Sequence, residues 1–109
     1  MSQSRQPVFR ALADPTRREI LNLLCAQDMS IAEVSDRFDM TRAAVKKHLT
    51  VLQSANLIRV QARGRERVNQ IRPEGLRPVT DWLGAFDVFW DKRLSALKSA
   101  VENEETPDD

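Results

Sequence analysis

Basic residues are concentrated in one part of this 109-residue chain. Between Thr41 and Arg72 there are eight lysines and arginines but one acid, Glu66, which gives the segment a net charge of +7. The rest of the chain carries −6, and the whole chain +1. Cationic side chains gathered in this way suit a polyanion. The alternative, an ordinary solvated surface, does not explain why the charges coincide with the structural pattern described below.

Residues for other kinds of chemistry are few. There is one cysteine, Cys25, and one histidine, His48, so the chain alone can form no internal disulfide and no typical zinc site. We interpret Cys25 as a small core residue, with a redox switch as the alternative. His48 is expected on the core side of its helix, as a hydrogen-bonding residue or a single phosphate contact. No nucleophile, phosphate loop or carboxylate pair indicates an enzyme, and we expect no metal and no cofactor.

The composition is that of one globular domain, with 41% hydrophobic and 30% charged residues. No apolar run approaches 18 residues and the N-terminus lacks the apolar segment of a signal peptide, so the cytoplasm is the expected location. We predict a disordered N-terminus over residues 1–6, one domain over 7–101 and a disordered acidic tail over 102–109.

Four helices are predicted in the first half of the chain. Apolar spacing indicates a short helix over residues 8–12. Asp14 and Pro15 begin a second, because aspartate caps free N–H groups and proline suits the first helical position. Ser30 and Glu33 have capping-box spacing and begin a third. After a tight turn, Thr41 can cap a fourth helix over residues 42–55, with one apolar face and one face that is basic, small and polar.

Two strands and a long helix complete the pattern. Apolar and polar residues alternate over 58–63, residues 64–66 can form a turn, and 67–72 can return as a second strand. A long helix is predicted from Val79, with apolar residues at spacings of three and four. Such a stripe would be a large exposed patch on a small domain, so it indicates an interface with a second copy. The alternative is that it closes the core of the monomer.

The predicted fold is therefore mainly α, in the order helix, helix, helix, helix, strand, strand, helix. Two short helices joined by a tight turn, the second with a basic free face, match a helix–turn–helix, whose second helix enters the major groove of double-stranded DNA. Arg42 can pair with guanine O6 and N7, and the hairpin would follow the backbone or reach the minor groove. The residues expected to contact DNA are Thr41, Arg42, Ala43, Lys46, Lys47, Thr50, Arg63, Gly64, Arg65 and Arg67. Arg17 and Arg18 are open to phosphate contacts or to intramolecular salt bridges.

Several segments resemble the ArsR family of bacterial repressors, over roughly residues 8–101. The most specific are LADPTRREIL (12–21), VKKHLTVLQSANLI (45–58) and Gly64 in the hairpin. The resemblance implies a winged helix–turn–helix, a homodimer formed through the first and last helices, and repression by occupying an operator. The implied dimer interface comprises Val8, Phe9, Leu12, Val79, Trp82, Leu83, Phe86, Phe89, Trp90, Leu94 and Leu97.

The chain departs from the metal-sensing members of that family. Two cysteines flank the position of Ile31 in their pattern, where this chain has Ser30 and Ala32, and the last helix has no histidine. The operator sequence of relatives cannot be transferred to this chain, because the family commonly has polar residues similar to glutamine and serine at the positions of Arg42 and Ala43. Asn69 likewise replaces a common aromatic residue of the second wing strand.

The favoured function is a sequence-specific DNA-binding regulator, most simply a repressor. As a homodimer it would read a palindromic operator with half-sites about 34 Å apart. The alternative is a winged-helix adaptor that binds proteins, which would not need a face of charge +7.

Overall fold

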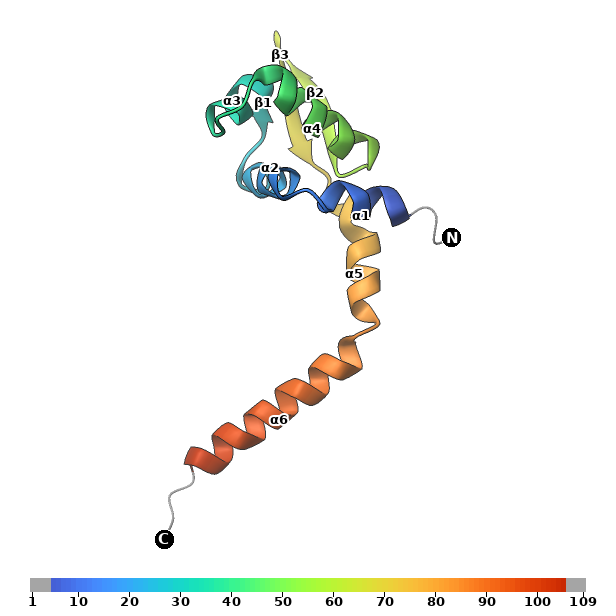
Figure 1. Ribbon diagram of the computed structural model, residues 1–109, viewed down its shortest axis with the longest axis vertical. Helices are drawn as coiled ribbons and strands as arrows, with labels where there is room; N and C mark the ends of the chain where they lie inside the picture. The colour runs from blue at the N-terminus through green and yellow to red at the C-terminus, as the bar shows by residue number, and fades with distance from the viewer. Residues whose placement is uncertain (1–4, 106–109) are drawn as a thin grey trace. The chain divides into compact units, whose positions relative to one another are not determined.

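The computed structural model describes residues 5–105, and the chain divides into two compact units at Val79 (Figure 1). The domain predicted over 7–101 spans both units. Residues 1–4 and 106–109 of the predicted disordered termini lie outside the described part of the chain. Gln6 and residues 102–105, which we also predicted to be disordered, belong to helices in the structure.

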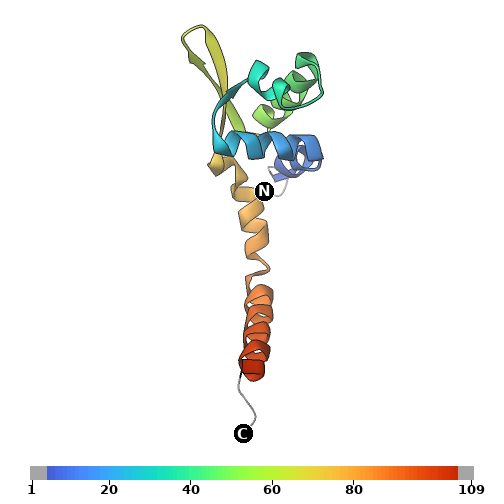
Figure 2. The ribbon, with the colours of Figure 1, turned by 90° about the vertical axis from the view of Figure 1, so that its left-hand side faces the viewer.

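The first unit contains the predicted helices and hairpin (Figure 1). Its elements are α1 (Gln6–Leu12), α2 (Pro15–Ala26), β1 (Met29–Ser30), α3 (Ile31–Asp36), α4 (Arg42–Ser54), β2 (Ile58–Arg63), β3 (Glu66–Ile71) and the 3-10 helix η2 (Pro73–Leu76). α3 and α4 form the helix–turn–helix pair. Figure 2 shows the hairpin of β2 and β3 projecting beyond the helices of this unit.

Side-chain caps fix where three of the helices begin, as the sequence predicts. The Asp14 carboxylate accepts the N–H of Thr16 at 2.7 Å and starts α2. Ser30 and Glu33 form a reciprocal capping box at α3. The Thr41 hydroxyl accepts the N–H of Ala44 at 3.1 Å and starts α4. Each cap satisfies N–H groups that the helix itself leaves free.

The sheet has three antiparallel strands in the order β1-β3-β2, so the predicted two-stranded wing gains one strand. The added β1 pairs Met29 with Asn69. Asn69 is 3% exposed, at a position where an apolar residue would be expected. Its side-chain amide donates to the carbonyl of Met29 at 3.1 Å, so the buried amide has a hydrogen-bond partner. A buried amide thus joins the hairpin to the segment between α2 and α3.

The hairpin turn is one residue shorter than predicted. Arg63 pairs with Glu66, which leaves Gly64 and Arg65 as a two-residue loop. Gly64 has φ +63° and Arg65 does not have positive φ, the pattern of a type II′ turn with glycine at its first central position. β3 therefore begins at Glu66 and not at Arg67.

The core of the first unit is assembled from α1, α2, α3, α4 and the strands, with Ile20, Leu24, Val45 and Leu52 at its centre. Val8, predicted at a dimer interface, is 5% exposed and belongs to this core, because α1 packs against α2 and α4. The prediction for Cys25 is also wrong. Its thiol is exposed, since Ile20, Leu21 and Leu24 form a buried arc of about 100° on α2 and Cys25 lies about 40° beyond the Leu21 edge of that arc.

The long helix predicted from Val79 is in fact two helices, α5 (Arg77–Gly84) and α6 (Asp87–Glu105). Gly84 ends α5, as a residue with low helix propensity readily does. The N–H groups of Ala85 and Phe86 then bond to carbonyls three residues back, which tightens the last turn. Among the described helices, none combines the length and apolar character that crossing a membrane requires.

Candidate nucleic-acid interface

The outer face of α4 carries positive charge that has no acidic partner in the described part of the chain. Val45, Leu49 and Leu52 of this helix are buried. The five residues of α4 predicted to contact DNA are all exposed: Arg42, Ala43, Lys46, Lys47 and Thr50. Within residues 5–103, no acidic side chain pairs with the three cations among them. The Thr41 side chain is occupied by its cap. This face can therefore meet a polyanion without breaking an ion pair.

The hairpin divides its predicted DNA-binding residues between two faces. Partners in an antiparallel ladder share a face, and neighbours along a strand alternate. The pairs Arg63–Glu66 and Ala62–Arg67 are consecutive, so Arg63 and Arg67 point to opposite sides. Arg65 lies at the tip beside Gly64 and is exposed.

Arg63 has a partner that local sequence patterns could not reveal. Its guanidinium pairs with the carboxylate of Asp28, 35 residues earlier in the chain. The same carboxylate accepts the Gln70 amide at 3.2 Å, and Gln70 in turn accepts from Arg59 at 2.6 Å. These contacts tie the hairpin to the segment before β1 and compensate the charge of Arg63. In the described part of the chain, Arg65 and Arg67 have no such compensation.

Arg17 forms an intramolecular salt bridge, one of the two alternatives that the sequence left open, since its guanidinium lies 3.6 Å from Asp14, whereas Arg18 bonds to a backbone carbonyl instead. Arg17 donates to the carbonyls of Ala11 (2.7 Å) and Arg10 (3.2 Å), and Arg18 donates to that of Leu12 (2.7 Å). These carbonyls belong to the last turn of α1, where an α-helix leaves acceptors free, and that of Arg10 also accepts the N–H of Ala13 at 3.3 Å. The two arginines therefore fix the C-terminus of α1 onto α2.

His48 is half-buried on α4, and its Nδ1 lies 3.5 Å from Nη1 of Arg17. This placement agrees with the structural alternative predicted for it. Among residues 5–103, no three His, Cys, Asp or Glu side chains are grouped so that they could hold a metal ion.

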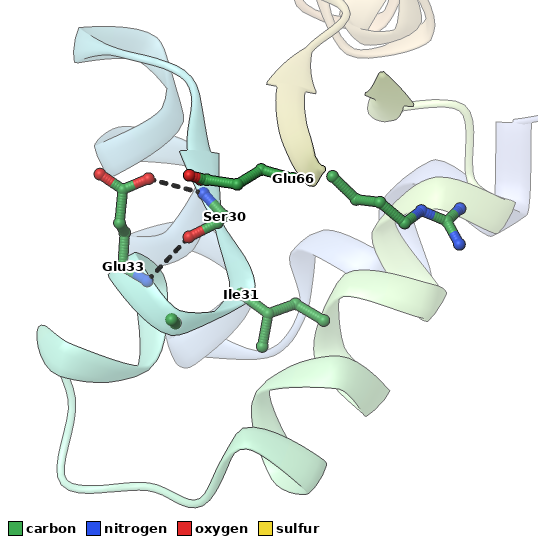
Figure 3. A pocket seen from close by; sticks show the side chains of 6 residues that line it. Ser30, Ile31, Glu33 and Glu66 are labelled. Carbon is green, nitrogen blue, oxygen red and sulfur yellow. Dashed lines mark hydrogen bonds between the residues drawn. The ribbon is translucent and has the colours of Figure 1, made fainter. Parts of the chain in front are cut away.

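Another hollow of the first unit lies on a different surface. It has a volume of about 620 Å³ and is lined by α3, its cap and the start of β3 (Figure 3). Glu33 and Glu66 lie on it, and the Glu33 carboxylate is already bonded to the N–H of Ser30 at 3.0 Å. Two carboxylates against the single guanidinium of Arg67 make this hollow a poor site for an anion, which leaves α4 and the hairpin as the candidate interface.

Known proteins share this arrangement and sequence. The model of the family described as "Bacterial regulatory protein, arsR family" matches residues 14–60. The HTH-type transcriptional regulator Rv2034 of Mycobacterium tuberculosis is 34% identical over 106 residues, which cover 95% of this chain and 96% of that protein. The transcriptional repressor SdpR of Bacillus subtilis is 30% identical over 76 residues, with 70% and 84% covered.

A solved structure gives the same result. The ArsR-like transcriptional regulator from Rhodococcus sp. RHA1 superposes with a TM-score of 0.72 at 33% identity, covering 91% of this chain and 93% of that one. Fold, sequence and the basic face of α4 thus agree, and the relatives are of a non-enzymatic class. The chain belongs to the ArsR family and is a DNA-binding transcriptional regulator with a winged helix–turn–helix.

Proposed function

We propose that the protein is a homodimeric repressor that acts by occupying a palindromic operator. The observation that carries this proposal is the uncompensated basic face of α4, where Arg42, Lys46 and Lys47 are exposed without acidic partners in the described chain. The relative in Bacillus subtilis is named a repressor, which supports repression rather than activation of transcription. Because the bacterial chromosome is the proposed target, we expect the protein to act in the cytoplasm.

Each part of the interface has a proposed task. Arg42, in the first turn of α4, would read a guanine through a bidentate contact, and Ala43 would let the helix approach the bases. Lys46, Lys47 and Thr50 would bind phosphates. Arg65, at the tip of the hairpin, would follow the backbone or enter the minor groove, which Gly64 assists by permitting the tight turn. Phosphate contacts would supply affinity and register, and base contacts specificity.

The apolar surface of the second unit supports the proposed dimer. Large side chains along α5 and α6 are between 40% and 62% exposed: Trp82, Leu83, Phe86, Phe89, Trp90, Leu94, Leu97 and Val101. The aromatic rings of Phe89 and Trp90 already pack edge to face at 5.3 Å. A contiguous apolar surface of this kind marks an interface. Phe9, Leu12 and Val79 of the first unit, which are half-buried, are also proposed to belong to the dimer interface.

The test is a comparison of DNA fragments at physiological salt. Fluorescence anisotropy should show that the upstream region of the protein's own gene binds at least about 10³-fold tighter than a scrambled fragment. Lys47→Gln should weaken binding to both fragments, while Lys98→Gln, which removes the same charge from α6, should not. Equal affinity for both fragments would refute sequence-specific regulation.

A further inference from the structure

A small cleft separates α4 from one face of the hairpin. It has a volume of about 190 Å³. Its lining comes from three elements and from the residue that begins α3: Ile31, Lys46, Leu49, Thr50, Gln53, Val60, Arg67 and Asn69. The strand register explains why Arg67 is among them. Val60–Asn69 and Ala62–Arg67 are alternating pairs of the same ladder, so all four residues share the face that lies toward α4.

Two uncompensated cations line this α4–hairpin cleft from its two sides. Lys46 comes from α4 and Arg67 from β3, and neither has an acidic partner among the described residues. Thr50 and Gln53 add a hydroxyl and an amide from successive turns of α4. Apolar groups of Ile31, Leu49 and Val60 also line the cleft, as is usual where a few polar groups orient a ligand.

Contacts on both faces of the hairpin hold the walls of the cleft in place, those of Asp28 on the far face and that of Asn69 on the face of the cleft itself. Asp28 binds both Arg63 and Gln70, and the buried Asn69 amide donates to Met29. These bonds fix the backbone of β3 before any ligand arrives, so at this strand binding has to order only the side chain of Arg67.

The size and charge of the cleft select its ligand. Since a water molecule occupies about 30 Å³ of liquid, 190 Å³ corresponds to about six waters. That volume suits one tetrahedral oxyanion with its remaining hydration and is below the 300–1,000 Å³ typical of drug-sized ligands. Arginine and lysine together favour a phosphate, because arginine can bind two of its oxygens and lysine contributes a point charge.

We infer that the α4–hairpin cleft binds a single phosphate group between Lys46 and Arg67, with Thr50 donating a further hydrogen bond. The phosphate can come from the backbone of bound DNA, in which case the inference rests on the proposed function, or from free phosphate in solution. In both cases the recognition helix and the hairpin would be joined through one anion.

The first experiment uses the full chain without DNA. Inorganic phosphate is titrated at constant ionic strength against chloride, and the side-chain N–H signals of Gln53, Asn69 and Arg67 are followed by NMR. Saturable shifts at these signals are expected, and they should disappear in Lys46→Gln and in Arg67→Gln. Lys98→Gln, which removes the same charge from α6, should retain them.

The second experiment uses DNA and a double-mutant cycle. If Lys46 and Arg67 hold the same phosphate, Lys46→Gln/Arg67→Gln should lose less affinity than the product of the two single losses. Lys46→Gln/Arg65→Gln, which combines the cleft with the hairpin tip, should lose the full product. The slope of log affinity against log salt should fall by about one in the first double variant, since a single phosphate contact is lost.

The two experiments separate the sources of the phosphate and the two proposals. Shifts with free phosphate support a site for a free anion, and coupling in the cycle supports a backbone phosphate. If the wild-type protein prefers no DNA fragment, the proposed function fails, and the phosphate titration alone tests whether the cleft binds a phosphate group. The inference would be overturned if phosphate causes no NMR shifts and the Lys46→Gln/Arg67→Gln variant loses the full product of the two single losses of DNA affinity. Thermal unfolding checks that the variants are folded.

Discussion

Arg17 connects three helices through one guanidinium group. It extends from α2, donates to the carbonyls of Arg10 and Ala11 at the end of α1, and lies 3.5 Å from His48 of α4. Asp14, the cap of α2, lies 3.6 Å from the same guanidinium. Since α4 is the proposed recognition helix, these residues determine where it stands on the rest of the first unit.

Replacing Arg17 should therefore destabilise the first unit. Arg17→Leu keeps an apolar stem but leaves the Ala11 carbonyl without its 2.7 Å donor. The loss of such bonds should lower the free energy of unfolding by about 1–3 kcal/mol. Arg18→Leu removes one exposed bond to Leu12 and serves as the matched control, with a smaller loss. Urea denaturation measures both variants, and equal losses would contradict the role given to Arg17.

Asp14 should make stability depend on pH. Partial desolvation raises the pKa of its carboxyl, but hydrogen bonds from the backbone N–H groups of Arg17 and Thr16 and the charge of Arg17 outweigh this effect and lower the pKa. A carboxylate with a lowered pKa stabilises the fold above its unfolded-state pKa, and that stabilisation is lost as the pH falls through the folded-state pKa.

The measurement compares the wild type with Asp14→Asn, which keeps a capping oxygen without the charge. The wild type should have the higher midpoint of thermal unfolding at pH 7. The difference should shrink as the pH falls through the carboxylate range. A difference that is the same at pH 7 and pH 3 would show that the Asp14 charge does not stabilise the fold.

At the scale of the element, the sequence predicted those features of the helices and strands that are determined by residues close together along the chain. The caps at Asp14, Ser30 and Thr41 and the alternation in β2 are of this kind. The two-residue β1 is not, because it exists only through pairing with β3 about 40 residues later.

Two further elements could not be read from the pattern. The break between α5 and α6 falls inside an apolar stripe whose spacing continues across it, so periodicity alone predicted one helix. The ion pair that compensates Arg63 required knowledge of where Asp28 lies in space. Of the predicted DNA-binding residues, Arg63 is thus the one whose environment differs most from the expectation.

Gly75 allows η2 to pack tightly against the end of α4. A Cβ at this position would lie 2.0 Å from the carbonyl oxygen of Asn56, a residue that itself has φ +68°. Because the obstacle is backbone, it cannot rotate away. Gly75→Ala should therefore destabilise the first unit by about 1–3 kcal/mol, the usual range for overpacking.

Gly84 provides the control for that prediction. An added Cβ there would have only the Asp87 carboxylate at 4.0 Å, so Gly84→Ala should be tolerated in the same denaturation experiment. A Gly75→Ala variant as stable as Gly84→Ala would mean that η2 does not approach Asn56 as closely as the structure has it.

At the scale of the whole molecule, the two faces of α6 permit a test of the proposed dimer. Leu94 is 62% exposed on the apolar stripe, whereas Val88 is 67% exposed about 120° from it around the helix. Neither belongs to the core of the first unit, so replacing them should leave that unit folded. Leu94→Glu places a charge within the proposed interface, and Val88→Glu places one outside it.

Sedimentation equilibrium should therefore find Leu94→Glu monomeric at concentrations where the wild type and Val88→Glu are dimers. Loss of the dimer also removes the simultaneous occupation of two half-sites. Affinity for a palindromic fragment should then fall by at least about 100-fold, because the second half-site is no longer bound intramolecularly. Affinity for an isolated half-site should hardly change, since α4 and the hairpin are intact. If Val88→Glu dissociates the protein and Leu94→Glu does not, the dimer is formed by another surface.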